Sequence, residues 1–575
     1  MTPKAGRRPV GALGPYRVLL HETFGVPQLP SRPLERTRMT PSRLLLTAAL
    51  TLGTLFVTSA AAMGSPKLAS PTCTDSWKAP TSGLWSVAGN WTTGVPGEAG
   101  PVAACITVPG TYTVTLAPWS IGTADPNHQF AAITSLTLGA AGGPGTQTLV
   151  VEGQSSPNNS NEQVNTTGLS TTEPSLITAH GRLVLSSTDG GEKAKGLPYG
   201  GDAVVTGGPF TNHGAVTTMV QDVNNKAADY TQFYSALTNE PGASVTDQSG
   251  LLDVNSITNT GTLTVARGAS MDLALQPPGS GYANGVFTNS GTVTNRGAIS
   301  AQQGTWSQLG GRVTGGAVVL QDATKLVDRS GEASFVVNSS SAELVGTVPH
   351  GQTITVIGGT YNYQGENYAS TSLGLGGTTV VNDGTIVLDA QGPKTGGGAA
   401  VINDGALLNN GNIVAEVTHS AWTVSWQIGL TNNRSGKVTV TGGTMNESGG
   451  GSDANAGTVT VAPGATWLLQ EGSAFTNQSG GTLVTQIAGP TRFGQFQIAN
   501  PCCNGDGAVN AGGALVPALV GGYKPPANKE FPIFQLVGGK FAGTFRRVRG
   551  GFAADYKHET STPAFVGIIY GKTTT

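Results

Sequence analysis

Charged residues are scarce in this chain of 575 residues: only 11% are Asp, Glu, Lys or Arg, against roughly a quarter in an average soluble protein. Coiled coils and helical bundles need Ala, Glu, Lys, Leu and Arg in bulk, so this composition argues against them. The formal net charge is only −2, which is too small to keep a chain disordered. Nucleic-acid-binding proteins normally show a basic surplus. We therefore expect neither a helical bundle nor a nucleic-acid partner.

Aromatic residues are also few, at 6%, whereas 85 residues are glycine. The glycines follow no strict three-residue period, which excludes collagen. What the chain has in quantity is Gly, Thr, Asn and Val. Such a mixture favours short strands joined by many turns.

The N-terminal region predicts export. Residues 1–38 have no apolar period and are expected to be a non-native or disordered leader. From Met39, a basic residue, an apolar run over 44–57 and the small residues 59–62 follow the order of a secretory signal peptide, residues 39–62, with cleavage after Ala62. The run is shorter than the roughly 20 residues that span a bilayer. We expect a secreted, extracellular or cell-surface protein with no membrane span in the mature chain.

The mature chain would be acidic and would contain all four cysteines. Without residues 1–62 it has 23 basic and 31 acidic residues, which disfavours anionic partners further. An even cysteine count in an exported chain predicts disulfides, and we expect Cys73 to pair with Cys105. Cys502 and Cys503 either form a vicinal disulfide or stay free. No Cys-x-x-Cys or nearby His pair supports a zinc site, so neither a metal nor another cofactor is expected.

A short phrase recurs along the chain: an apolar residue, a spacer, Asn, any residue, Gly, a spacer and a second apolar residue. The copies centre on Asn212, Asn259, Asn289, Asn295, Asn382, Asn403 and Asn409, with variants at Asn432, Asn455 and Asn477. Asn-x-Gly tolerates the positive φ that a tight corner between strands needs. Stacked Asn side chains from successive coils are expected to hydrogen-bond along a ladder.

The spacing of these copies predicts a solenoid. Asn382 and Asn403 are 21 residues apart, and steps of 22 or 23 residues lead from Asn409 through Asn432 and Asn455 to Asn477. A period near 22 suits a right-handed parallel β-helix with three short strands per coil. The alternative is an antiparallel sandwich of Asn-Gly hairpins, which would show turns every 8–12 residues and no longer repeat. We expect an all-β, right-handed parallel β-helix with capped ends.

Both ends of the mature chain differ from the repeats. Residues 73–125 contain Trp77, Trp85, Trp91 and Trp119, and the exposed edges of a solenoid require caps. The run Gly89-Asn90-Trp91, followed by Gly94-Val95-Pro96-Gly97, and the strand and Pro/Gly-turn order over 493–545 resemble bacterial secreted β-helix surface proteins of the adhesin and autotransporter-passenger type.

The resemblance implies an N-terminal cap over 63–125, β-helix repeats over 126–490 and a C-terminal β cap over 491–575. It also implies an extracellular surface role. The sequence shows no C-terminal membrane barrel of the kind that this family carries. We therefore expect a product that is released or held at the surface without a covalent link.

The stretch around Glu416 and Trp426 is the densest in chemically useful side chains. Trp422 and Trp426 are an even number of residues apart, so on a strand they face the same way and predict a stacking platform for sugar faces. Glu416 and His419 are weak catalytic candidates, as hydrogen-bonding or acid/base groups. The alternative is that the aromatic rings simply fill the core.

Glycoside hydrolysis needs two carboxylates about 5–10 Å apart. Asp383 and Asp404 are 21 residues apart and both precede a corner glycine, so they are the second weak catalytic pair. A capping role at a turn explains them equally well. The string over 504–507 resembles part of a calcium loop but lacks the remaining ligand positions.

Three functions follow from these observations. The first is an adhesive or structural surface that binds an extracellular polysaccharide or a cell-surface glycan, with self-association possible. The second is a polysaccharide lyase or glycoside hydrolase. The third is an ice- or crystal-binding solenoid, which requires Thr-x-Thr pairs aligned on adjacent coils; the pairs at Thr262/Thr264, Thr292/Thr294 and Thr458/Thr460 look scattered in the sequence.

Overall fold

The computed structural model divides the chain by its contacts into two units, Met1–Lys67 and Leu68–Thr575. It describes residues 72–117, 128–154, 166–188, 201–221, 230–273, 285–339, 341–359, 361–363, 366–368, 370–390, 398–418, 423–449, 451–470, 472–499, 507–559 and 564–572, all of them in the second unit. Several predicted features lie outside these residues: the leader, the signal peptide, Trp119, His419, Trp422, Cys502, Cys503 and residues 504–506.

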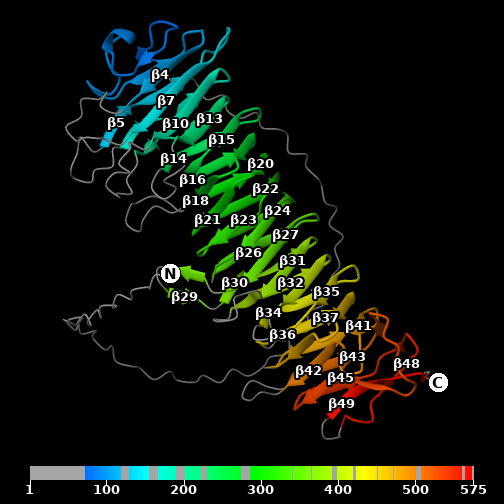
Figure 1. Ribbon diagram of the computed structural model, residues 1–575. Coiled ribbons are helices and arrows are strands. Elements are labelled where there is room, and N and C mark those ends of the chain that lie inside the picture. The colour runs from blue at the N-terminus through cyan, green and yellow to red at the C-terminus, as the bar shows by residue number, and fades with distance from the viewer. Residues whose placement is uncertain are drawn as a thin grey trace, which may run out of the picture. The chain divides into compact units, whose positions relative to one another are not determined.

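Strands make up nearly all the regular structure of the described residues (Figure 1). The first part of the chain forms η1, a 3-10 turn over Ala88–Asn90, and β1 (Asp75–Ser76), β2 (Gly83–Leu84), β3 (Ala103–Ile106), β4 (Tyr112–Leu116), β5 (His128–Ile133), β6 (Ser135–Leu138), β7 (Gln147–Gln154), β8 (Thr166–Thr171), β9 (Ser175–Ile177), β10 (Gly181–Thr188), β11 (Ala203–Gly207), β12 (Phe210–Asn212) and β13 (Ala215–Val220).

The middle of the chain continues with β14 (Tyr230–Asn239), β15 (Ser244–Asp247), β16 (Gly250–Asn259), β17 (Thr262–Val265), β18 (Ala269–Leu273), β19 (Val286–Asn289), β20 (Thr292–Asn295), β21 (Ala298–Gln302), β22 (Thr305–Gly315), β23 (Val318–Gln321), β24 (Lys325–Glu332), β25 (Ser334–Val337), β26 (Ala342–Val348), β27 (Thr353–Gly358), β28 (Tyr361–Tyr363), β29 (Glu366–Tyr368), β30 (Ser370–Asn382) and β31 (Thr385–Ala390).

The last part forms β32 (Ala399–Asn409), β33 (Asn412–Val417), β34 (Thr423–Asn432), β35 (Lys437–Val440), β36 (Thr444–Glu447), β37 (Ser452–Asn455), β38 (Thr458–Val461), β39 (Thr466–Leu469), β40 (Ala474–Asn477), β41 (Thr482–Ile487), β42 (Gln495–Ala499), β43 (Ala508–Ala511), β44 (Ala514–Leu519), β45 (Glu530–Val537), β46 (Lys540–Gly543), β47 (Arg547–Val548), β48 (Phe552–Asp555) and β49 (Ala564–Tyr570).

The strands stack as coils of a parallel β-helix, which confirms the predicted fold class. In one coil β18, β19 and β20 follow each other, and in the next coil β21 and the two halves of β22 take the same places. Each strand pairs in parallel with its successor one coil later, β18 with β21, β19 with the first half of β22 and β20 with its second half. We call the sheet through β18 the first face, that through β19 the second face and that through β20 the third face.

Alternation along each strand sends every second side chain inward to a continuous apolar core. Phe287 and Trp306 occupy equivalent places in adjacent coils and stack with their ring centroids 4.0 Å apart. Phe496 and Phe534 repeat this arrangement near the C-terminus, at 5.0 Å. Burying one such side chain contributes about 1.5–3 kcal/mol, so the coils are held together mainly by this internal column.

Asparagine side chains form two hydrogen-bonded ladders inside the coils. The first lies at the corner between the second and third faces and joins Asn212, Asn239, Asn259, Asn289 and Gln308, with amide-to-amide distances of 2.8–3.3 Å. The second lies at the corner between the third and first faces and joins Asn382, Asn409, Asn432, Asn455 and Asn477, at 2.7–2.8 Å. The predicted ladder is therefore present, but it occupies two different corners.

The coil length agrees with the prediction only in the second ladder. Its steps from Asn409 to Asn477 are 23, 23 and 22 residues, whereas the first ladder has steps of 27, 20 and 30 residues. The expected 21-residue step from Asn382 to Asn403 is wrong, because Asn382 bonds to Asn409, 27 residues later.

The N-terminal end is fixed by a disulfide and by buried tryptophans. Cys73 and Cys105 are bonded, as expected. Trp77, Trp85 and Trp91 are buried. The Trp85 indole donates to the Pro96 carbonyl at 3.1 Å and the Trp91 indole to the Trp85 carbonyl at 2.7 Å. Parallel pairing already starts here, between β1 and β3 and between β2 and β4.

Parallel coils also continue beyond residue 490, where the C-terminal cap was expected to begin. β42 pairs in parallel with β45, β43 with β46 and β44 with β47. Only β49 reverses direction, because it pairs antiparallel with β45 and β48. Among the described residues, no helix is long and apolar enough to cross a membrane.

Candidate functional site

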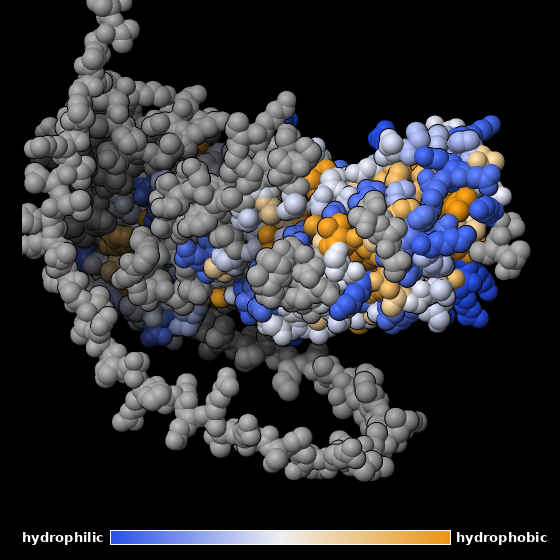
Figure 2. Space-filling view, turned by 90° about the horizontal axis from the view of Figure 1, so that it is seen from below, coloured by the Kyte–Doolittle hydropathy of each residue, from blue (hydrophilic) through white to orange (hydrophobic). Residues whose placement is uncertain are grey.

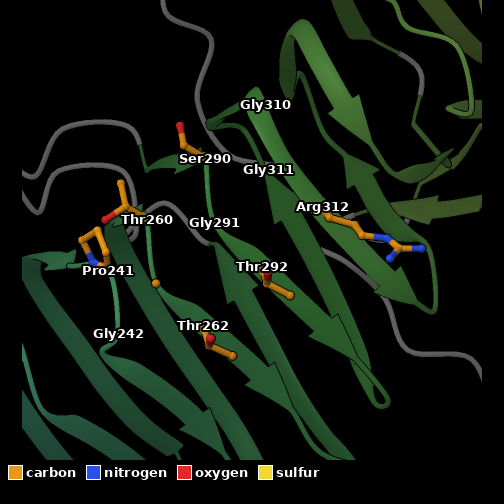
Figure 3. Close-up of a pocket in the computed structure, with 11 residues that line it drawn as sticks. Pro241, Gly242, Thr260, Thr262, Ser290, Gly291, Thr292, Gly310, Gly311 and Arg312 are labelled. Atoms are coloured by element: carbon orange, nitrogen blue, oxygen red, sulfur yellow. The ribbon is translucent and has the colours of Figure 1, made fainter. Parts of the chain in front are cut away.

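A shallow groove of about 480 Å³ crosses successive coils at the corner between the second and third faces. Figure 3 shows its lining: Thr262 and Thr292 project side by side from neighbouring strands, with Arg312 beyond them. The complete lining is Pro241, Gly242, Thr260, Gly261, Thr262, Ser290, Gly291, Thr292, Gly310, Gly311 and Arg312. These residues follow β14, β16 and β19 or lie in β17, β20 and β22.

Glycine forms the floor of this groove because no side chain fits between the coils there. A Cβ atom on Gly261 would lie 2.4 Å from the carbonyl oxygen of Glu240. On Gly291 it would lie 2.3 Å from the Gly261 oxygen, and on Gly311 2.4 Å from the Gly291 oxygen. The glycine of the Asn-x-Gly phrase is thus required by close stacking, and the groove is a by-product of the repeat.

Hydroxyl groups stand in two parallel rows beside the floor, on the third face. The first row joins Ser244, Thr262 and Thr292, and the second joins Thr246, Thr264, Thr294 and Thr314. All are exposed or half-buried. The expectation that the Thr-x-Thr pairs are scattered is therefore wrong for Thr262/Thr264 and Thr292/Thr294, because the 30-residue coil between them brings the two pairs into register.

The spacing of these rows is set by the sheet. Adjacent parallel strands lie about 4.8 Å apart, and alternate residues along one strand lie about 6.6 Å apart. Each hydroxyl offers one donor and two acceptor positions. The surface is therefore a regular array of hydroxyl and methyl groups beside bare backbone, suited to a neutral, hydroxyl-rich and extended ligand.

Charge is nearly absent from this groove. Arg312 is its only charged lining residue, and its guanidinium is paired with Glu332 at 3.0 Å on the surface. No carboxyl, imidazole or thiol is among the lining residues. The groove can bind and orient a ligand but offers no general acid or base for hydrolysis.

The predicted tryptophan platform is wrong for Trp426. Its side chain is fully buried in the core and cannot meet a ligand from solvent. β34 alternates Val424, Trp426, Ile428 and Leu430 on its inward side, all buried. That alternation was readable from the sequence and indicates the core position. Its partner in the prediction, Trp422, lies outside the described residues.

Glu416 is half-buried on the outer side of β33, on the first face. His419, its expected partner, lies outside the described residues. The structure instead places Asp389 of β31 directly beside Glu416 in the adjacent coil. The sequence does contain the signal for this neighbour, because each carboxylate follows a ladder asparagine, Asn382 or Asn409, by seven residues.

Asp383 and Asp404 do not form a pair. Asp383 is exposed at the corner between the third and first faces, where it accepts a hydrogen bond from Asn410 at 2.8 Å. Asp404 lies at the other asparagine corner, in the left-handed conformation with φ of 57°. The two corners carry the same sequence phrase, and for this reason spacing alone misplaced the pair.

Asp404 instead shares a depression of about 550 Å³ with Glu343. Glu343 is bound to Lys325 at 2.9 Å. Two carboxyls in one depression are a possible acid/base set, although the ion pair occupies one oxygen of Glu343.

One set of side chains among the described residues has the donor types for a metal ion. Ligand atoms of Glu530, Asp555 and His558 lie within 4.8 Å of one another. The imidazole of His558 is 3.6 Å from Glu530 and stacks on Phe565. The sequence analysis did not select this set, since its members are far apart in the chain and come together only where β45, β48 and the following turn meet.

Comparison with protein families finds no match for the chain, and comparison with curated proteins finds none. Among solved structures, the chain is similar to a crystal structure described as a TibC-catalysed, hyper-glycosylated TibA fragment. The identity is 14% and the TM-score 0.21, and the match covers 70% of this chain and 97% of that one.

Proposed function

We propose that the protein is an exported, bacterial surface or extracellular β-helix whose groove binds an extended neutral glycan, in an adhesive or structural role. The observation that carries this proposal is the glycine-floored groove with its two hydroxyl rows. A linear polysaccharide presents hydroxyl groups at a regular repeat, and the rows offer matching donors and acceptors over several coils. The predicted signal peptide and the disulfide Cys73–Cys105 support export.

The test is binding of the purified full-length protein to insoluble neutral polysaccharides and peptidoglycan, read as protein depletion from the supernatant. The double variant Thr262→Val/Thr292→Val removes two hydroxyls and keeps the β-branched shape. We expect it to bind at least about tenfold more weakly, because each hydrogen bond contributes about 1 kcal/mol.

Thr458→Val/Thr460→Val is the matched control. It removes the same chemistry from the half-buried outer side of β38, on the first face. Equal binding by the two double variants would refute the assignment to the groove. Release of reducing or unsaturated sugar would instead favour the enzyme, with Glu343 and Asp404 as the first residues to replace.

A second candidate function rests on the alignment of Thr246, Thr264 and Thr294 in adjacent coils. Flat crystals, ice among them, also present a regular array, and a rigid two-row hydroxyl surface is suited to such a face. Freezing hysteresis measured on wild type and on Thr262→Val/Thr292→Val decides this candidate: no hysteresis in the wild type would exclude it.

A further inference from the structure

A second glycine-floored groove, of about 240 Å³, lies near the C-terminus at the corner between the third and first faces. Gly481 and Gly513 form part of its floor for the same reason as in the first groove. A Cβ atom on Gly513 would lie 2.2 Å from the Gly481 carbonyl oxygen, and one on Gly481 would lie 2.2 Å from that of Asn455. The second asparagine ladder therefore produces a strip free of side chains, as the first ladder does.

The walls of this groove differ from those of the first groove because three arginines line it. Arg546, Arg547 and Arg549 are all exposed. The backbone N–H of Arg547 donates to the Gly513 carbonyl at 3.2 Å, and that of Arg549 to the Leu515 carbonyl at 3.1 Å. The last coil thus fixes the positions from which two of the guanidinium groups extend.

These arginines are not neutralised by the described part of the chain. No carboxylate among the described residues forms an ion pair with any of the three. The surrounding sequence has the same sign: residues 491–575 contain nine basic and four acidic residues, while residues 63–490 contain 14 basic and 27 acidic ones. In Figure 2 strongly hydrophilic residues gather at the right-hand end, over the C-terminal coils. A local positive field on an otherwise acidic chain calls for a specific reason.

We propose that the arginine groove is a binding site for an acidic polysaccharide, a chain of sugars bearing carboxylate groups. Guanidinium groups bind carboxylates through paired N–H donors in one plane. The bare floor and the adjoining hydroxyls of Ser479 and Thr482 suit the sugar ring that carries the acid. The site is separate from the hydroxyl groove and does not rest on the function proposed for it.

The decisive experiment compares binding of polygalacturonate, a uronic acid polymer, by three forms of the full-length protein. The groove variant is Arg546→Gln/Arg547→Gln/Arg549→Gln. The matched control is Lys524→Gln/Lys557→Gln/Lys572→Gln, which removes the same charge from exposed positions of the same region, outside the groove. Because all six side chains are exposed, we expect both variants to fold, with unchanged thermal midpoints.

We expect the groove variant to bind polygalacturonate at least about tenfold more weakly, the lysine variant to stay within about threefold of wild type, and wild-type affinity to fall as salt rises. Equal losses in both variants would overturn the proposal, since they would indicate a diffuse field. Binding of duplex DNA with the same dependence on the three arginines would also overturn it in favour of polyanions in general. Binding of neutral polysaccharide is measured in parallel, and its failure bears on the hydroxyl groove alone.

Discussion

At the scale of single residues, the buried asparagines are the most demanding positions in the chain. Asn432 accepts a hydrogen bond from the side chain of Asn409 and donates one to that of Asn455, both at 2.7 Å. Only an amide side chain of this length carries a donor and an acceptor on one planar group. A carboxylate at this position would lose the donor, and an aliphatic side chain would lose both.

We predict that Asn432→Leu lowers the free energy of unfolding by about 1–3 kcal/mol. The replacement has a similar volume, but it leaves the Asn409 amide N–H and the Asn455 carbonyl oxygen of the ladder without their partner. Urea unfolding of the full-length protein measures the effect. Asn412→Ala, at an exposed outer position of β33, is the control. Equal shifts in the two variants would show that the ladder adds nothing.

Sequence reasoning at this scale succeeded where the local chemistry is unique and failed where it depends on orientation. The Asn-x-Gly phrase identified ladder members such as Asn432 before any coordinates. It missed Asn239 and Gln308, whose surroundings depart from the phrase. Trp426 was misjudged, because evenly spaced tryptophans indicate a shared side of a strand but not which side is the core.

At the scale of elements, the corner is the unit that the sequence specifies. The phrase at Asn289 turns the chain from the second face to the third, and the same phrase at Asn409 turns it from the third face to the first. Both corners ask the same of the backbone, so a single sequence predicts that there is a corner but not which one. Steps of 20 to 30 residues add to the ambiguity, and the alignment of Thr264 with Thr294 was lost for this reason.

The corner glycines give a prediction at this scale. In Gly291→Ala the new methyl group would meet the backbone oxygen of Gly261 at 2.3 Å, so the coils must move apart. We expect a loss of about 1–3 kcal/mol, as for overpacking in a core, together with weaker glycan binding in the adjoining groove.

Gly142→Ala is the matched control for this prediction. A Cβ atom at Gly142 meets nothing within 4 Å. Thermal unfolding and the polysaccharide depletion assay should therefore leave it close to wild type. Stability of Gly291→Ala equal to that of Gly142→Ala would contradict the view that close stacking selects glycine.

At the scale of the whole molecule, carboxyl groups inside the solenoid link stability to pH. Asp247 and Asp328 are fully buried inward side chains, and their burial raises the pKa of each carboxyl to about 8. Thr218 donates to Asp247 and Gln352 donates to Asp328. Burial also raises the pKa of the neighbouring carboxyls of Glu447 and Asp453. These groups are distributed along the column of coils, so their protonation affects the chain at several levels.

The sign of the effect follows from proton counting. The pKa of an aspartate in the unfolded chain is about 3.9, and in the folded chain burial raises the pKa of Asp247 and Asp328 to about 8. Between these values the folded state holds more protons than the unfolded state, so stability falls as pH rises. Their contribution is complete below about pH 4 and is lost by about pH 8. We therefore expect the thermal midpoint to be lower at pH 8 than at pH 5, by about 3 °C or more.

The variant Asp328→Asn isolates one of these groups, since it keeps a hydrogen-bonding side chain in place of the buried acid. We expect it to flatten the fall in midpoint between pH 5 and pH 8, because one proton fewer is linked to unfolding. Asp383→Asn removes a carboxylate from the exposed corner and should leave the slope as in the wild type. A slope in Asp328→Asn as steep as in the wild type would show that Asp328 does not hold its proton in the folded solenoid.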